Sequence, residues 1–304
     1  MGRTLATEQR NPRTVDIDVS ETIDILTMLN DEDARVPTAV RAILPALARV
    51  VDDAVERYRA GGTIYYFGAG ASGRIGALDA AELPPTFSIP RERVVARIAG
   101  GPDSMIRAQE DLEDSPRRGE GDAGDVRAGD VVFGLTASGS TPYVAGVIRS
   151  SHAAGALTIV VSSNDNPALR RICDHYLHVD TGPESIAGST RMKAATAQKL
   201  ILNSFSTALM IRMGMTYSNL MVDVAQTNEK LRARAVRILG QATGRPEAVC
   251  RRHLERSGGR VKVALLTLLG APSEAAAVAA LDRAEGRTRE ALRYLDGARP
   301  PDET

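Results

Sequence analysis

Two glycine- and hydroxyl-rich segments are the residues whose types and spacing best suit ligand chemistry. Gly68–Gly73 (GAGASG) follows the apolar run Thr63–Phe67 and precedes a helical pattern, and Thr136–Thr141 (TASGST) stands in the same position after Val131–Leu135. A turn from strand to helix offers backbone N–H groups and the positive end of the helix dipole to an anion. Two such turns in one sheet predict a shared anion site.

The sequence around these turns narrows the kind of anion. Gly68–Gly73 matches the G-x-G-x-x-G dinucleotide pattern, but that pattern needs a carboxylate at the end of the second strand. Here Val94–Ile98 is followed by Ala-Gly-Gly, and no Gly-Lys-Ser/Thr signature for a triphosphate is present. A phosphomonoester on a small molecule fits better. The alternative is two ordinary tight turns with helix caps, which would be favoured for either segment alone.

The elements that position these turns follow an α/β pattern. Continuous apolar strands alternate with helices, which predicts a parallel sheet covered by helices on both faces. We expect strands at 63–67, 94–98, 131–135, 157–162 and 176–180, and helices at 36–59, 74–83, 103–113 and 142–153. A long helix capped by Ser189 or Thr190 should run to about 213, and a second from about 217 to 239.

The remainder of the chain reads as short helices separated by Gly and Pro. We therefore expect one α/β domain with an N-terminal helical segment at 1–239, and a small helical domain at 240–304 with a disordered tail (DGARPPDET).

Composition excludes several functions. The 304 residues carry 38 Lys and Arg against 38 Asp and Glu, with 4 His and 2 Cys. A zero net charge argues against nucleic-acid binding, and scattered His and Cys argue against a metal site. Neither a signal peptide nor a membrane span is evident, and free cysteines suit a reducing compartment. We expect a cytoplasmic protein without a metal, a nucleic-acid partner or a membrane partner.

Longer sequence segments, which include the two turns, resemble a known family of the sugar isomerase (SIS) domain type, the N-acetylmuramic acid 6-phosphate etherases. The resemblance covers about residues 7 to 239 and, more loosely, the helical tail. It is carried by TEQRNP (7–12), NDED (30–33), GAGASGRIGALDAAELPPTF (68–87), AGG (99–101), EDLED (110–114), TASGSTPYV (136–144), GPESIAGSTRMKAATAQKLILN (182–203) and NLMVDVAQTNEKL (219–231).

The resemblance implies a lyase that cleaves the D-lactyl ether of N-acetylmuramic acid 6-phosphate, giving N-acetylglucosamine 6-phosphate and D-lactate, in cell-wall amino sugar recycling. It implies no cofactor, and a cytoplasmic homodimer whose site the second subunit completes. The family's catalytic acid falls on Glu82 and its base on Glu113. The residues matched to substrate or phosphate binding are Gly70, Ser72, Gly73, Ser138, Gly139, Ser140, Thr141, Glu184, Ser189 and Lys193.

The residues agree with this chemistry in part. An aldehyde at C1 of the opened sugar acidifies the C2 proton, so elimination needs a base, an acid and hydrogen-bond donors. We expect Pro84 and Pro85 to end a helix just after Glu82, where the negative end of the dipole would raise the carboxyl pKa and suit an acid. Glu113 lies among other carboxylates; the resemblance alone separates it from a solvated cluster. Ser140 stands where the family usually has an arginine. Either a charge contact is weakened by this replacement, or the Ser140 hydroxyl donates to phosphate directly; both alternatives stay open.

Two other functions remain open at this point. A non-catalytic sugar-phosphate sensor would keep the two loops, although the presence of both Glu82 and Glu113 argues against it. A sugar-phosphate isomerase would use the same loops on a different sugar.

Overall fold

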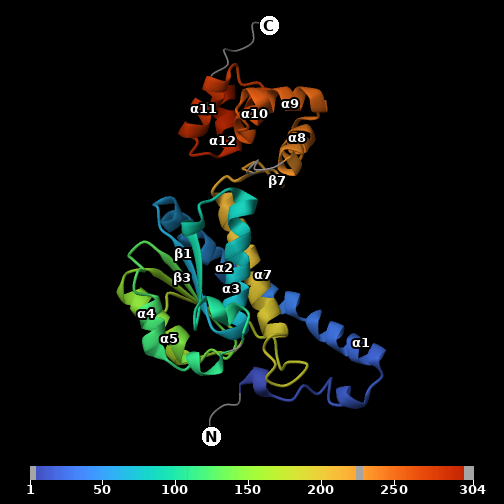
Figure 1. The fold of residues 1–304 in the computed structure, drawn as a ribbon, viewed down its shortest axis with the longest axis vertical. Coiled ribbons are helices and arrows are strands. Elements are labelled where there is room, and N and C mark those ends of the chain that lie inside the picture. The colour runs from blue at the N-terminus through green and yellow to red at the C-terminus, as the bar shows by residue number, and fades with distance from the viewer. Residues whose placement is uncertain (1–4, 108, 224–228, 298–304) are drawn as a thin grey trace. The chain divides into compact units, whose positions relative to one another are not determined.

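The computed structural model describes residues 5–107, 109–223 and 229–297. Contacts divide the chain into two compact units, Met1–Ala81 with Pro90–Thr207, and Glu82–Ile89 with Ala208–Thr304. The expected disordered tail therefore lies outside the described residues, except for its first two. Figure 1 shows the elements of both units.

The first unit is built on a five-stranded parallel sheet, as the sequence predicted. Its strands are β1 (Ile64–Gly68), β2 (Val94–Ile98), β3 (Val131–Thr136), β4 (Leu157–Ser162) and β5 (His175–His178), in the spatial order β2-β1-β3-β4-β5. Because β2 and β3 lie on opposite sides of β1, the chain changes direction across the sheet between β1 and β3. Ligands bind at such a switch point, outside the carboxyl ends of the strands.

Helices cover both faces of this sheet. In chain order they are α2 (Val36–Arg59), α3 (Gly70–Phe87), α4 (Pro116–Asp122), α5 (Pro142–Ala153), α6 (Pro167–Arg170) and α7 (Lys193–Arg212). Successive side chains of a strand point to opposite faces. Tyr65 and Phe67 accordingly join the cluster formed with α5, whereas Tyr66 packs edge-on to Phe133, which contacts Phe205 of α7.

Helices α4 and α5 approach closely because glycines stand at their contact. A Cβ at Gly119 would lie 2.0 Å from the Tyr143 carbonyl oxygen, and one at Gly146 would lie 2.0 Å from the Pro116 carbonyl oxygen. Backbone oxygens cannot move away as a side chain can, so both positions require glycine.

This contact gives a matched pair of variants in one helix. Gly119→Ala should lower the free energy of unfolding by about 1–3 kcal/mol, because overpacking displaces backbone. Gly121→Ala, in the same helix but with open space around its Cβ, should leave stability unchanged or raise it by up to about 1 kcal/mol. Denaturant unfolding of both variants measures the difference, and equal effects would contradict the packing argument.

The N-terminal segment comprises the short 3-10 helices η1 (Ala6–Glu8) and η2 (Ile17–Val19), followed by α1 (Thr22–Asp33). Its anchors to the rest of the first unit are hydrogen bonds to loops at the carboxyl ends of the strands. The Thr14 hydroxyl donates to the Ser185 carbonyl oxygen at 2.7 Å, and the Asn164 amide donates to the Thr7 hydroxyl at 3.0 Å.

The second unit is helical apart from a two-stranded hairpin, β6 (Thr216–Tyr217) and β7 (Leu220–Met221). Its helices are α8 (Glu229–Thr243), α9 (Glu247–Arg256), α10 (Val261–Leu268), α11 (Glu274–Arg283) and α12 (Thr288–Asp296). Ala235 and Leu239 of α8 pack with Cys250, Leu254 and Leu265. The expected boundary after residue 239 thus falls inside α8, whose apolar face belongs to the helical unit.

Three expected elements differ from the structure. The helix expected from 217 begins instead as the hairpin, where Ser218 adopts a φ of 54°; its residues 224–228 lie outside the described residues. The helix expected at 103–113 is two 3-10 turns, η4 (Pro102–Met105) and η5 (Glu110–Leu112). Helix α3 continues through Pro84 and Pro85 to Phe87.

Two of these differences have a physical reason in tertiary contacts. The Arg74 side chain donates to the carbonyl oxygens of Ser104 and Met105 at 2.8 and 3.0 Å, which fixes that segment as a turn. On either side of the two prolines of α3, Leu83 and Phe87 are buried, and this burial offsets the lost helix hydrogen bonds.

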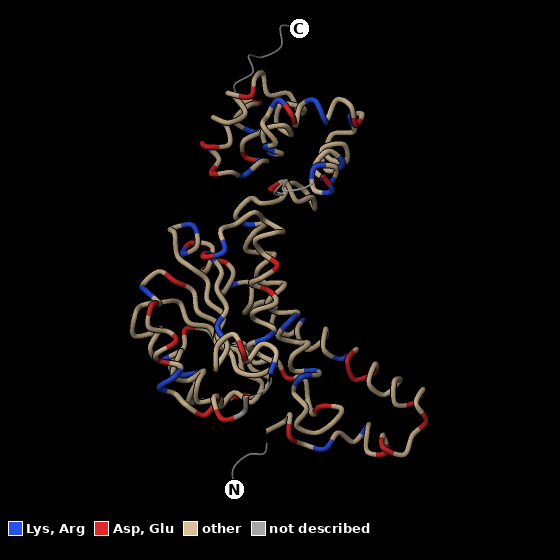
Figure 2. The backbone as a smooth tube through the Cα atoms, in the orientation of Figure 1, with Lys and Arg blue, Asp and Glu red and all other residues tan. Residues whose placement is uncertain are grey.

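No helix within the described residues is both long enough and apolar enough to cross a membrane. Basic and acidic side chains are interspersed along the backbone of both units (Figure 2).

Candidate functional site

The two glycine-rich loops lie at the carboxyl ends of neighbouring strands, as the sequence predicted. Gly68 at the end of β1 pairs in register with Leu135 of β3, and the loops lead directly into α3 and α5. The first loop is tight: a Cβ at Gly68 would lie 2.7 Å from the Gly73 nitrogen. Gly70 has a φ of +52°, and Ser72 is buried. The switch point therefore carries two helix N-termini, which favour an anion.

Hydroxyl groups organise the second loop from within. Thr136 Oγ1 lies 2.8 Å from Thr141 Oγ1 and accepts the Gly139 N–H at 3.1 Å. The Ser140 N–H and hydroxyl both donate to Ser138 Oγ, at 3.1 and 3.2 Å. Neither loop contains Lys or Arg. An anion here would be held by neutral donors and helix dipoles rather than by a cation in the loops.

Two asparagines and a tyrosine that the sequence analysis did not single out support the second loop. Asn164 Nδ2 donates to the Ala137 carbonyl oxygen at 2.9 Å, and Asn166 Nδ2 donates to that of Gly139 at 2.6 Å. The Tyr176 hydroxyl donates to the Asn164 carbonyl oxygen at 2.7 Å. For the two asparagines, the signal that would have found them is their place just after β4, at the same sheet edge as the loops; Tyr176 lies within β5, and its sequence position gives no such signal.

Gly139 is confined by the same supports. Its φ is +73°, and a Cβ there would lie 2.8 Å from Ser162 Oγ and 2.9 Å from the Asn164 carbonyl oxygen. The position therefore needs glycine both for its backbone angle and for space.

Glu184 and Lys193, matched to substrate binding in the sequence, are both fully buried. The Glu184 carboxylate accepts the backbone N–H groups of Lys193 and Ala194 at 2.9 and 3.0 Å, so it caps α7. Burial raises the Glu184 pKa, while these N–H groups and the Lys193 charge oppose that rise. The expected cap from Ser189 or Thr190 is wrong, because the long-range carboxylate occupies the helix start; half-buried Ser189 lies in the preceding turn.

The Lys193 ammonium lies 2.5 Å from the carboxylate of Glu32, whose side chain is 2% exposed. Glu32 also accepts from the Asn11 amide at 2.8 Å and is paired with the Arg13 guanidinium. Burial by itself raises the Glu32 pKa, but the hydrogen bonds from Arg13, Lys193 and Asn11 outweigh it and lower the pKa to about 2. The N-terminal segment, α1 and α7 meet at this one carboxylate.

Removing that charge should be costly. Glu32→Gln leaves the Lys193 ammonium buried without a counter-charge and should lower stability by about 3–5 kcal/mol. Because the folded-state pKa lies below the unfolded value, the contribution is present above about pH 4.5 and is lost as pH falls towards 2. Unfolding measured from pH 7 to 2 should show this loss in the unmodified protein but not in Glu32→Gln.

Asp24→Asn is the matched control, since it removes an exposed carboxylate from the same helix. A Glu32→Gln protein as stable as this control would contradict the central role of the ion pair.

Glu82 and Glu113, matched to the catalytic acid and base, are both exposed. Glu82 lies in the last turns of α3, within the second unit, and its carbonyl oxygen accepts the Thr86 hydroxyl at 2.6 Å. Because α3 continues past the prolines, Glu82 is not at the helix end where the sequence placed it. Glu113 follows η5 in the first unit, and its carbonyl oxygen accepts the Tyr143 N–H at 2.9 Å.

A buried carboxylate three residues before Glu82 was also missed. Asp79 accepts from the Tyr66 hydroxyl at 3.0 Å, the Asn203 amide at 2.8 Å and the Ser206 hydroxyl at 3.1 Å. Burial raises its pKa, and these three donors partly counter that effect. The network joins β1, α3 and α7 across one face of the sheet. In the described residues, no group of three or more His, Cys, Asp or Glu side chains is placed to hold a metal ion.

Comparison with known proteins agrees with this geometry. Residues 46–152 match the family described as the glucokinase regulatory protein N-terminal SIS domain. A phosphoheptose isomerase from Francisella tularensis has the same fold, with a TM-score of 0.50 and 17% identity over 63% of this chain and all of that one.

Closer relatives extend over nearly the whole sequence. The N-acetylmuramic acid 6-phosphate etherase of Thermobifida fusca is 55% identical over 86% of this chain and 86% of its own length. The etherase of Halalkalibacterium halodurans is 46% identical over 96% of this chain and 99% of its own length. The chain therefore belongs to the N-acetylmuramic acid 6-phosphate etherase family.

Proposed function

We propose that this protein cleaves the D-lactyl ether of N-acetylmuramic acid 6-phosphate and releases N-acetylglucosamine 6-phosphate and D-lactate. The observation that carries the proposal is the 55% identity to an etherase over 86% of the chain. The two hydroxyl-rich loops at the switch point of the sheet support it, because they suit a phosphomonoester. The reaction is a carbon–oxygen lyase reaction, followed by addition of water.

In this proposal, uncharged N–H and hydroxyl groups bind the phosphate. The N–H groups at the start of α3 and α5, with the hydroxyls of Ser72, Ser138, Ser140 and Thr141, would surround the phosphate oxygens. Exposed Ser140 donates to Ser138 in the absence of ligand, and turning its hydroxyl outward would exchange that bond for one to phosphate. Gly70, Gly73 and Gly139 let the backbone approach.

The chemistry then needs one base and one acid. With the sugar ring open, the C1 aldehyde acidifies the C2 proton, which Glu113 removes. Lactate leaves from C3 while Glu82 protonates its ether oxygen, and water adds to the resulting double bond. No nucleophile on the protein is required. In this proposal Glu184 and Lys193 act indirectly: both are buried, and the Glu184 carboxylate accepts the N–H groups at the start of α7.

Replacing each glutamate separates the two steps. Glu113→Gln should lose D-lactate release by about 10²-fold or more, together with deuterium exchange at C2, since the base is gone. Glu82→Gln should lose lactate release to a similar extent while C2 exchange survives. A lactate assay and NMR of the sugar in D₂O measure the two reactions.

Asp111→Asn is the control for this experiment, because it removes an exposed carboxylate beside Glu113. Full lactate release by both glutamine variants would remove these residues from their roles. Tight binding of the sugar phosphate by the unmodified protein without lactate release would favour a sensor over an enzyme.

We further propose a cytoplasmic homodimer, as the family resemblance implies. Three large apolar side chains of the N-terminal segment support a subunit contact, because they are exposed: Val19 is 79% exposed, Ile23 69% and Leu26 57%. Contiguous exposed apolar surface of this kind marks interaction sites.

Substitutions in the N-terminal segment can test whether the protein is a dimer. The double variant Ile23→Ser with Leu26→Ser should sediment as a monomer, because two apolar anchors are lost, while the unmodified protein sediments as a dimer. Leu78→Ser, which replaces another exposed leucine, should remain dimeric. An unmodified protein that is monomeric at micromolar concentration would refute the proposal.

A further inference from the structure

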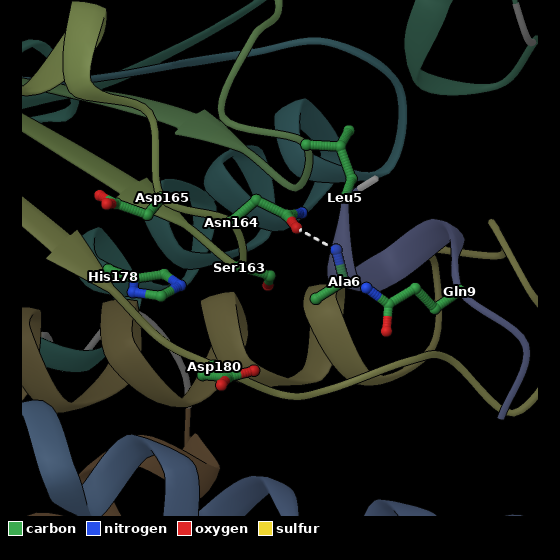
Figure 3. Close-up of a pocket in the computed structure, with 8 residues that line it drawn as sticks. All are labelled: Leu5, Ala6, Gln9, Ser163, Asn164, Asp165, His178 and Asp180. Carbon is green, nitrogen blue, oxygen red and sulfur yellow. Dashed lines mark hydrogen bonds between the residues drawn. The ribbon is translucent and has the colours of Figure 1, made fainter. Parts of the chain in front are cut away.

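A cavity lies in the first unit beside the turn that follows β4. It has a volume of about 310 Å³ and is formed where β4 and β5 end. Figure 3 shows its lining, which comes from the N-terminal segment, the turn after β4 and the residues that end β5. This volume is at the lower end of the range for small-molecule sites, about 300–1,000 Å³. In the sheet order, β1 and β3 carry the loops, whereas β4 and β5 carry this cavity.

The polar part of the lining is acidic. Asp165, Asp180 and His178 face the cavity together with amide side chains, and none of the lining residues that the structure describes is a Lys or Arg. Asp165 is paired with Arg170 at 2.5 Å. Within the described part of the chain, the Asp180 carboxylate has a backbone N–H, that of Gly182 at 2.9 Å, but no salt bridge. The cavity thus favours a ligand with a positive charge and disfavours a phosphate.

An unpartnered hydroxyl points to a ligand independently of this charge. Ser163 is 1% exposed, and its Oγ has no hydrogen-bond partner among the residues that the structure describes. In Figure 3 its side chain lies between His178 and Ala6, within the lining of the cavity. Buried side-chain polar atoms are nearly always hydrogen-bonded. This hydroxyl is therefore available to a group that enters the cavity.

We infer that this cavity binds a small ammonium compound that also carries hydroxyl groups, namely an amino alcohol or an unphosphorylated amino sugar. The ammonium group binds the Asp180 carboxylate, and a ligand hydroxyl bonds to Ser163 Oγ. Leu5 and Ala6 provide an apolar side for the carbon skeleton. A phosphorylated sugar is disfavoured because the Asp180 carboxylate faces it and no Lys or Arg is among the described lining residues.

The wall of this cavity is connected to the second loop through one side chain. Asn164 Oδ1 accepts the Ala6 N–H at 2.7 Å, and Asn164 Nδ2 donates to the Ala137 carbonyl oxygen at 2.9 Å. A ligand that orders this wall therefore changes the affinity of the loop for its anion, and the coupling acts equally in the other direction. This second step, unlike the binding itself, rests on the proposed function.

Glucosamine is the probe, and glucose, with a hydroxyl in place of the ammonium group, is its neutral counterpart. Calorimetry should show glucosamine binding to the full chain at least about tenfold more tightly than glucose, the factor expected of a charge-assisted hydrogen bond. Asp180→Asn should weaken glucosamine binding by about tenfold or more. Ser163→Ala should weaken it by about two- to tenfold. Glu56→Gln, which removes an exposed carboxylate of α2, should bind as the unmodified protein does.

The outcome is independent of the etherase reaction. Titrations are repeated with saturating N-acetylglucosamine 6-phosphate, so that the phosphate site proposed at the two loops is occupied. Glucosamine binding that survives this saturation and is weakened in both Asp180→Asn and Ser163→Ala supports the site. Equal binding of glucose, binding abolished by the sugar phosphate, or no binding overturns it. D-lactate release by the unmodified protein, measured separately, tests the proposed function alone.

Discussion

The buried contact between Glu32 and Lys193 is the interaction on which the arrangement of the first unit depends. The Glu32 carboxylate is bound by Lys193 of α7 and by Asn11 and Arg13 of the N-terminal segment. Two charges removed from water are stable only when each is paired and hydrogen-bonded. Glu184 adds the second constraint by capping α7, because the first N–H groups of a helix have no partner within it. Together these carboxylates fix the long helix against the sheet and close the chain's N-terminal segment over the loops that follow the strands.

The strand order of the sheet determines the edge at which the two glycine-rich loops lie. Parallel strands bring the loops after β1 and β3 to one edge, and the reversal of strand order leaves room between them. Glycines set how closely the backbone of the loops can approach a ligand. Asn164 and Asn166 donate hydrogen bonds to backbone carbonyl oxygens of the second loop. Asn164 also lines the acidic cavity at β4 and β5, so the second loop and the cavity share this side chain. Neither loop of this chain contains Lys or Arg, and the proposed phosphate site and the proposed cation site differ in their electrostatic preference although Asn164 contacts both.

The sequence by itself determined the α/β class, the five strands, the position of both loops and the family. These features are local or periodic: continuous apolar runs specify buried strands, and glycine with hydroxyl residues specifies the turns. It also singled out Glu82 and Glu113, although only through the longer sequence segments that match the family. In the structure, the backbone carbonyl oxygen of each of them accepts a hydrogen bond.

Only the tertiary structure decided which polar residues are buried and what they contact. Glu32 and Asp79 are two among 38 acidic residues, and nothing in their neighbours along the chain distinguishes them. Glu184 was expected to contact a ligand because it follows the last strand, and Lys193 because it opens a helix; their partners in the structure are 9 and 161 residues away. Prolines 84 and 85 predicted a helix end by local geometry, whereas buried Leu83 and Phe87 carry the helix onward. In each case a contact or burial that propensity and spacing do not reveal outweighs the local preference, because desolvation and pairing energies depend on the folded surroundings.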